Sequence, residues 1–177
     1  MPGVAEQKLS LQEFHARFDG EKPHYEYWDG AAVRKSMPTF LHGLIQIMLG
    51  RLLNGIGYVP ASEVRLKLVP SYEPVPDVIA LDDAIGDPYP TAPFDVVIEI
   101  LSPDDSFSRV LRKCRLYEQW GIRQIVVIDP AERLVWRFEN GAAQETDVIA
   151  RRGDAAIPTQ ALWDEVDREL ARASGKP

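Results

Sequence analysis

The strongest structural pattern in this chain lies in residues 94–129, which read FDVVIEILSPDDSFSRVLRKCRLYEQWGIRQIVVID. An apolar run opens the segment, another closes it, and a charged stretch ending at Gly121 lies between them. Strands that are apolar throughout are typical of a parallel pair buried on both faces, and such a pair needs a crossover connection. We therefore predict two parallel strands joined by a helix over about 104–120, with Gly121 near its C-cap.

One residue of the first strand does not fit this pattern. Glu99 lies near the end of an apolar run that is expected to be buried. An ionised carboxylate that leaves water is strongly destabilising unless it is paired, protonated or bound to a metal. Glu99 therefore needs either a salt bridge to an Arg or Lys, or a bound cation.

Antiparallel elements flank this segment on both sides. The dipeptides Asp29-Gly30 and Asn140-Gly141 can adopt the positive φ of tight hairpin turns. The first predicts a hairpin over 24–35, and the second joins a strand at 133–139 to one at 146–152. Hairpins beside a parallel pair make the sheet mixed. The sequence thus predicts the α/β (α+β) class, with a central mixed β-sheet flanked by helices.

The other helices follow from capping residues and apolar periodicity. Ser10 and Glu13 have the spacing of a capping box, which predicts a helix from about residue 11 to Gly20. Apolar residues at intervals of three and four predict the longest helix, from Thr39 to about Gly55. A last helix is expected to begin at a Thr159 cap, and its buried face carries Leu162, Val166 and Leu170.

Two further strands are predicted before residue 94. Residues 77–81, DVIAL, form a short apolar run. Residues 63–69, EVRLKLV, alternate as a half-exposed strand does. Its predicted inner face carries Val64, Leu66 and Leu68, and its outer face carries Glu63, Arg65 and Lys67.

Composition limits the class of protein. The 177 residues, of which 45% are hydrophobic, suffice for one domain over 1–177, with a core of about 22–172 and frayed termini. The lone Cys114 cannot form an internal disulfide, and no signal peptide or apolar run of bilayer length is present, so we expect a cytoplasmic protein without a membrane partner. The formal charge of -7 argues against a protein that coats nucleic acid by charge alone, although a local basic face remains compatible with it.

The acidic residues suggest a metal site. Asp77 opens one strand and Glu99 lies late in the next, so neighbouring strands would bring both carboxylates to one sheet edge. Oxygen ligands of this kind suit Mg²⁺ or Mn²⁺. The alternatives are a turn role for Asp77 after Pro76 and a salt bridge for Glu99.

A basic helix follows this pair. Arg109, Lys113 and Tyr117 are four residues apart and share one helix face. A lysine beside a metal could position the water that attacks a phosphodiester and stabilise the charge that develops. The alternative is an ordinary solvated face. No zinc-ligand spacing, nucleophile elbow or glycine-rich phosphate loop offers a competing chemistry.

Four motifs carry a family resemblance. The stretches YEYWDG, PVPDVIAL, FDVVIEILSP and RKCRLYEQWGIRQIVVIDP together resemble the Uma-type putative restriction endonuclease family, a branch of the PD-(D/E)XK nuclease superfamily, over about 25–139. The resemblance implies a restriction-endonuclease-like fold with helices on both sides of the sheet. It also implies a Mg²⁺- or Mn²⁺-dependent endonuclease acting on nucleic acid, with DNA favoured over RNA, and a homodimer, because two strands require two sites.

The resemblance assigns roles residue by residue. It places the metal at Asp77 and Glu99, with the backbone carbonyl of Ile100 as a further ligand. Leu101 stands where the superfamily has its lysine, so Lys113 on the following helix is the expected replacement. The resemblance gives accessory roles to Glu26 and His42, which match a family glutamate in the first hairpin and a family histidine at the long helix. The shared helix face adds Arg109 and Tyr117 as further accessory candidates.

Several alternatives stay open at the level of sequence. His42 could equally be a helix-start histidine that faces solvent or makes an ordinary contact. Glu63 could be an extra acid of the site, although its place among alternating charges predicts the exposed face. The acidic charge and Leu101 also favour a second function, a non-catalytic nucleic-acid-binding or assembly module that retains the nuclease fold.

Overall fold

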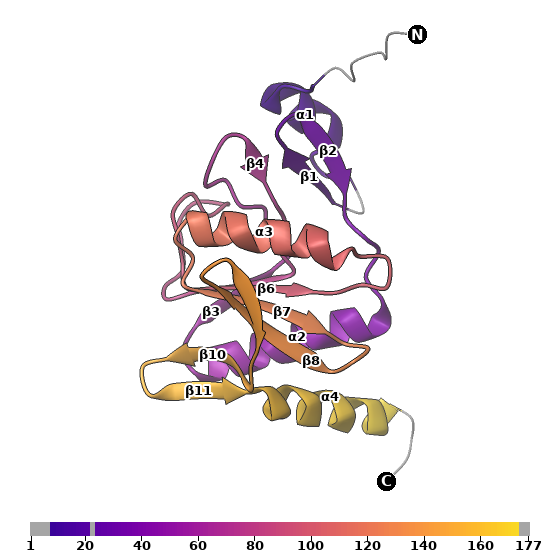
Figure 1. Cartoon of the computed structure of the whole chain (residues 1–177), viewed down its shortest axis with the longest axis vertical. Coiled ribbons are helices and arrows are strands. Elements are labelled where there is room, and N and C mark those ends of the chain that lie inside the picture. The colour runs from indigo at the N-terminus through magenta and orange to yellow at the C-terminus, as the bar shows by residue number, and fades with distance from the viewer. Residues whose placement is uncertain (1–7, 22–23, 174–177) are drawn as a thin grey trace.

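The computed structural model describes residues 8–21 and 24–173 (Figure 1). The expectation of frayed chain ends falls largely on residues 1–7 and 174–177, which lie outside these ranges. Within the two described ranges, no helix combines the length and the apolar character needed to cross a membrane.

The centre of the molecule is a six-stranded sheet with the order β3-β5-β6-β7-β8-β9. Its strands are β3 (Val59–Ser62), β5 (Val78–Leu81), β6 (Val96–Ile100), β7 (Gln124–Asp129), β8 (Leu134–Glu139) and β9 (Ala142–Glu145). The pair β6 and β7 is parallel and every other neighbouring pair is antiparallel. The predicted mixed sheet and its parallel pair are therefore confirmed.

Helices cover both faces of this sheet, as predicted (Figure 1). One face packs on α2 (Phe40–Gly55) and α4 (Thr159–Ala173), and the other face packs on α3 (Phe107–Gln119). Strand β6 is buried on both sides because Ile98 faces the first core and Val97 the second. This explains why its sequence is continuously apolar rather than alternating.

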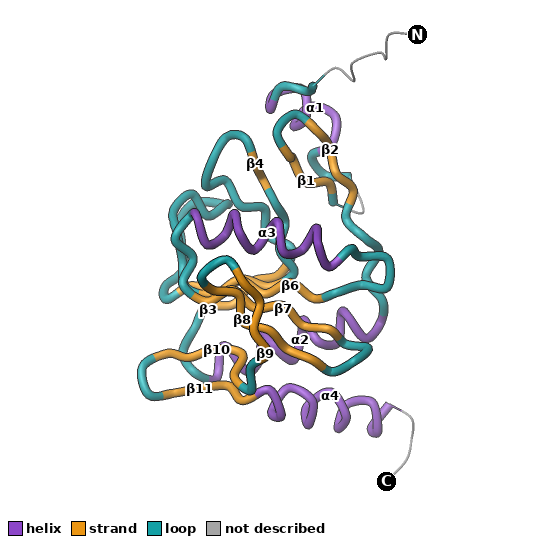
Figure 2. The backbone as a smooth tube through the Cα atoms, in the orientation of Figure 1, coloured by secondary structure: helices purple, strands orange, loops and turns teal. Residues whose placement is uncertain are grey.

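The N-terminal region forms a second, smaller sheet. Helix α1 (Leu11–Phe18) precedes the strands β1 (Tyr25–Trp28) and β2 (Ala31–Arg34), and β4 (Tyr72–Glu73) completes the order β2-β1-β4. The turn between β1 and β2 has the predicted positive φ at Asp29 and Gly30. Trp28 of this sheet lies under the guanidinium of Arg112 on α3, so α3 lies between the small sheet and the large one (Figure 2).

The prediction of a strand at residues 63–69 is wrong. The structure places β3 before it, and Glu63 then adopts a positive φ of 55°, which ends the extended run. Arg65, expected outside, is buried beside Glu73 and over the ring of Phe14. Apolar and charged residues alternate in this segment, but the segment does not form a strand, because the backbone turns at Glu63.

Three smaller differences concern the second half of the chain. The Asn140-Gly141 turn leads into β9, and the residues predicted to follow it form β10 (Val148–Arg152), which pairs with β11 (Ala155–Pro158) in a separate sheet. Helix α3 begins at Phe107, later than predicted, because Asp105 makes a turn with Ser102. On α4, Leu170 is exposed, so the buried stripe ends one turn early.

Candidate active site

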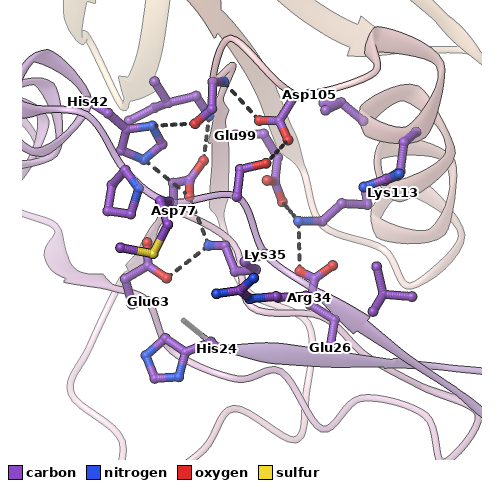
Figure 3. A pocket seen from close by; sticks show the side chains of 18 of the residues that line it. His24, Glu26, Arg34, Lys35, His42, Glu63, Asp77, Glu99, Asp105 and Lys113 are labelled. Carbon is purple, nitrogen blue, oxygen red and sulfur yellow. Dashed lines mark hydrogen bonds and ion pairs between the residues drawn. The ribbon is translucent and has the colours of Figure 1, made fainter. Parts of the chain in front are cut away.

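A pocket of about 450 Å³ opens where the small sheet, the start of α2 and the start of α3 meet the central strands (Figure 3). The residues that the sequence singled out as catalytic or metal-binding all line it. With them lie all the accessory candidates except Tyr117. The lining therefore includes Glu26, His42, Asp77, Glu99, Ile100, Arg109 and Lys113.

Asp77 and Glu99 lie opposite each other on neighbouring strands. Val78 of β5 pairs with Ile98 of β6 in antiparallel register, so Asp77, the residue before β5, faces Glu99. Directly opposed residues of an antiparallel pair project from the same face. The Ile100 backbone N–H donates to Asp77 Oδ2 at 2.7 Å and fixes that carboxylate. The register of two strands thus brings together the acids that the sequence separates.

Glu99 belongs to a buried cluster around the ammonium of Lys113. Lys113 Nζ lies 2.7 Å from Glu99 Oε1 and 2.9 Å from Glu26 Oε1 (Figure 3). The Tyr117 hydroxyl donates to Glu99 Oε1 at 2.6 Å from behind the pocket. Glu26 also accepts from the Val75 N–H at 2.8 Å. We call these four side chains, Glu26, Glu99, Lys113 and Tyr117, the Lys113 cluster.

The protonation of the Lys113 cluster follows from its burial. Burial raises the pKa of Glu99 to about 7, although Lys113 opposes the shift, and the charges of Asp77 and Glu26 add to it. For Glu26, burial acts in the same direction but Lys113 and Lys35 outweigh it, so its pKa lies below the ordinary value. Lys113 is also desolvated, but the surrounding carboxylates raise its pKa and keep it charged.

A second cluster surrounds Lys35, the residue after β2. Lys35 Nζ donates to Asp77 Oδ1 at 2.9 Å, to Glu63 Oε2 at 2.9 Å and to the Val75 carbonyl at 2.7 Å. Gln46 on α2 donates to the other oxygen of Glu63 at 2.9 Å. Together with His42, the residues Lys35, Glu63 and Asp77 form what we call the Lys35 cluster (Figure 3).

His42 completes the Lys35 cluster from the first turn of α2. Thr39 caps this helix by accepting the His42 N–H, which places the imidazole over Asp77. The side chain is buried, so the solvent-facing alternative is wrong. Nε2 lies 3.4 Å from Asp77 Oδ1, and Nδ1 lies 3.3 Å from Ser102 Oγ.

Asp77 is ionised in this setting. Burial disfavours its charge, but the ammonium of Lys35 and the contact with His42 outweigh burial and hold the pKa of Asp77 well below its usual range. The same carboxylates raise the pKa of Lys35 against its own burial. A deprotonated carboxylate is the state that metal coordination requires.

The Lys35 cluster has the donor set of a metal site. Within the described ranges, His42, Glu63 and Asp77 each offer a ligand atom, and these atoms lie within 4.8 Å of one another. Carboxylates with an imidazole suit a divalent ion such as Mn²⁺, and the Lys35 ammonium already lies among the carboxylate oxygens as a cation. The residues therefore fit a divalent ion at Asp77.

Two residues of the site were missed or misplaced by sequence reasoning. Lys35 was not singled out, because a lysine after a short hairpin gives no signal of its own. Glu63 was expected on an exposed strand face and instead lies in the pocket, turned inward by its positive φ. Arg109 is exposed at the pocket rim, and Tyr117 holds Glu99 without lining the cavity.

Known proteins were compared with the chain at three levels. Residues 11–171 match the model of a family described as "Uma2: Putative restriction endonuclease". A crystal structure titled as a putative nuclease belonging to DUF820 from Anabaena variabilis ATCC 29413 superposes with a TM-score of 0.78 at 21% sequence identity, covering 89% of this chain and 99% of that one. This likeness shows that the two chains share their α+β fold.

A second structure shares less with the chain. The structure titled "cryoEM structure DrdV-DNA complex" matches 69% of this chain and 10% of its own, with a TM-score of 0.40 and 22% identity. No curated protein matches the chain.

Proposed function

The chain belongs to the Uma2 family, and from this membership and the pocket geometry we propose that it is a metal-dependent endonuclease that hydrolyses phosphodiester bonds of nucleic acid, with DNA as the favoured substrate. One observation carries the proposal. Two acids on neighbouring strands, Asp77 and Glu99, meet a buried lysine from α3 in a single pocket.

The proposed ligands of the ion are Asp77, Glu99 and the backbone carbonyl of Ile100. When bound, Mg²⁺ or Mn²⁺ would supply a Lewis acid for the phosphoryl oxygens and a water of lowered pKa. The protonation state of Asp77 supports its role as a ligand. Lys35 compensates the burial of this carboxylate and lowers its pKa, so Asp77 stays ionised at neutral pH.

Lys113 is proposed to act on the phosphate itself. Its ammonium is fixed by Glu99 and Glu26 and lines the same pocket. A positive charge held in place in a poorly solvated site stabilises the negative charge that develops on phosphate in the transition state. Its position on α3 compensates for Leu101, which follows β6 and cannot supply this charge.

Basic groups at the pocket rim support a nucleic acid substrate. Arg34 and Arg109 are exposed and line the opening from β2 and α3. A negatively charged backbone can be held locally by these guanidinium groups even though the whole chain carries a formal charge of -7. A homodimer belongs to the same proposal, and sedimentation of the purified protein would measure it.

A nuclease assay tests the proposal. DNA and RNA substrates are incubated with Mg²⁺ or Mn²⁺ and with wild type, Asp77→Asn, Glu99→Gln or Lys113→Met. We expect each substitution to slow cleavage by roughly a hundredfold or more. Glu132→Gln, on the exposed turn before β8, is the matched control and should leave cleavage unchanged. Cleavage that survives Asp77→Asn would contradict the proposed site.

A second candidate function is a nucleic-acid-binding module without catalysis. Leu101 in place of the superfamily lysine favours it, as does the direct ion pair between Lys35 and Asp77. The two functions separate in one experiment: the module would retain DNA on a filter or gel with and without Mg²⁺ and would never cleave it.

A further inference from the structure

The Lys35 cluster differs from an ordinary buried ion pair because it surrounds its ammonium as ligands surround an ion. Lys35 Nζ touches two carboxylates and one backbone carbonyl, all at 2.7–2.9 Å. These are the ligand types that hard divalent cations prefer. The position of the Lys35 ammonium among these oxygens therefore marks a point in the pocket where a cation is stable.

His42 supplies an independent observation. Its side chain is only 4% exposed, and in the part of the chain that the structure describes its Nε2 has no hydrogen-bond partner. A buried imidazole nitrogen without a partner needs an explanation. Nε2 lies 3.4 Å from Asp77 Oδ1. When Nδ1–H donates to Ser102 Oγ at 3.3 Å, the Nε2 lone pair is available to an ion bound beside that carboxylate, as in a metal-ligating imidazole.

We propose that the divalent ion binds at the position of Lys35 Nζ, with His42 Nε2, Glu63 and Asp77 Oδ1 as protein ligands, and that Lys35 leaves the pocket as the ion enters. The proposal rests on the metal dependence proposed above. It keeps Asp77 as a ligand and takes His42 and Glu63 in place of Glu99 and the Ile100 carbonyl. Glu99 remains with Lys113, and Glu99→Gln would slow cleavage through that lysine.

Charge supports this exchange. Glu63 and Asp77 carry two negative charges against the single charge of Lys35, so the cluster keeps an excess of negative charge. A divalent ion at the same position would balance both carboxylates. The electrostatic attraction of the site is therefore larger for the divalent ion than for the ammonium, and the released lysine can reach solvent.

Position explains why Lys35 rather than Lys113 is the exchangeable cation. Lys35 lies on the connection between β2 and α2, and its carboxylate partner Glu63 has a side chain that is 30% exposed. Lys113 lies within α3, and its partners Glu26 and Glu99 are 5% and 6% exposed. The Lys35 ammonium can move toward water together with the segment between β2 and α2. The Lys113 ammonium cannot leave its site unless α3 unfolds.

Calorimetric titration with Mn²⁺ tests the exchange. Lys35→Met keeps the length of the side chain and removes its charge, so we expect the Mn²⁺ affinity to rise by about tenfold or more, because no ammonium competes for the site. Lys8→Met is the matched control, since Lys8 also pairs with an aspartate, Asp29, but on the surface. The affinity of this control should equal that of wild type.

The ligand set is tested in the same titration. Glu63→Gln should weaken Mn²⁺ binding by about tenfold or more, whereas Glu99→Gln should change it by less than about threefold. If wild type binds Mn²⁺ and Asp77→Asn abolishes binding, but Lys35→Met equals wild type, the exchange is wrong and the proposed function stands. The exchange is also wrong, and the proposed function again stands, if Glu99→Gln abolishes binding and Glu63→Gln does not. If neither wild type nor Lys35→Met binds Mn²⁺, both proposals fail.

Acylation of lysines in the wild-type protein provides a measurement that needs no folded variant. The protein is treated with an amine-reactive acetylating reagent with and without saturating Mn²⁺, and each lysine is quantified by mass spectrometry. The exchange predicts that Mn²⁺ increases the modification of Lys35 while Lys113 stays protected. Unchanged or reduced modification of Lys35 at saturating Mn²⁺ would overturn it.

Discussion

The pocket contains two lysine clusters of nearly the same composition in different surroundings. Each sets one ammonium against two carboxylates. The Lys113 cluster joins β1, β6 and α3 and is closed by Tyr117, whereas the Lys35 cluster is built largely from connecting segments and opens through Glu63. The difference shows that composition alone does not make a buried ion pair structural. The elements that carry it, and its access to water, decide whether its cation is fixed or exchangeable.

The largest expected effect is the loss of Lys113. Lys113→Met leaves Glu26 and Glu99 buried without a cation, and removal of one partner of a buried ion pair costs about 3–5 kcal/mol. Urea denaturation of the variant measures the free energy of unfolding. Lys8→Met, at the surface, should show no measurable change. A loss for Lys113→Met as small as that of the surface control would mean that the Lys113 cluster does not hold the fold.

Lys35→Met should destabilise the protein less. Glu63 is partly exposed and can be hydrated after the lysine is removed, so we expect a loss of roughly 2 kcal/mol in the free energy of unfolding. Saturating Mn²⁺ should then raise the melting temperature of this variant more than that of wild type, because the stabilisation of the folded state by a ligand grows with the logarithm of its affinity. If Mn²⁺ raised the melting temperature of both proteins equally, Lys35 would not be an exchangeable cation, and the two clusters would not differ in this respect.

Glu99 of the Lys113 cluster and Asp77 of the Lys35 cluster should respond oppositely to pH. The pKa of Glu99 is raised to about 7, so the stability that its protonated form contributes is fully present below its ordinary pKa and is lost as pH rises through about 7. The pKa of Asp77 is lowered, so its contribution is present above its ordinary pKa and is lost in acid.

Denaturation curves at several pH values measure this response. Between about pH 5 and 8 the free energy of unfolding of wild type should fall relative to that of Glu99→Gln, whose amide does not titrate. Parallel pH profiles for the two proteins in this range would show that Glu99 keeps an ordinary pKa.

The smallest effect is expected for Tyr117→Phe. This substitution removes only the hydroxyl that donates to Glu99 at 2.6 Å, and a hydrogen bond of this kind contributes about 1 kcal/mol to stability. Denaturation measures the loss. The same change at Tyr25, the first residue of β1, serves as a control and should be close to neutral. If Tyr117→Phe lowered the free energy of unfolding as much as Lys113→Met does, Tyr117 rather than Lys113 would be the residue that holds Glu99 in place.

The Lys113 cluster could be predicted from the sequence better than the Lys35 cluster. The apolar strands around Glu99 and the four-residue spacing of Lys113 and Tyr117 depend on regular elements, whose periodicity is visible in a single chain. The pairing of Asp77 with Glu99 also follows once β5 and β6 are neighbours.

The Lys35 cluster could not be predicted in the same way. Glu63 enters the pocket through a positive φ, inside a segment whose alternation imitates a strand. Lys35 reaches Asp77 only because the small sheet places the end of β2 beside the start of β5, and this packing has no local signature. His42 was noticed but could not be told from an ordinary helix-start histidine, since its burial depends on the same packing.

A crystal structure of the protein soaked with Mn²⁺, with the ion located by its anomalous scattering, tests the account most directly. We expect one Mn²⁺ per chain in direct contact with Asp77 and Glu63, with Lys35 Nζ moved away from Asp77 and Lys113 still bound to Glu99. The absence of an ion at Asp77, or an ion there with Lys35 still in contact with Asp77 Oδ1, would contradict it.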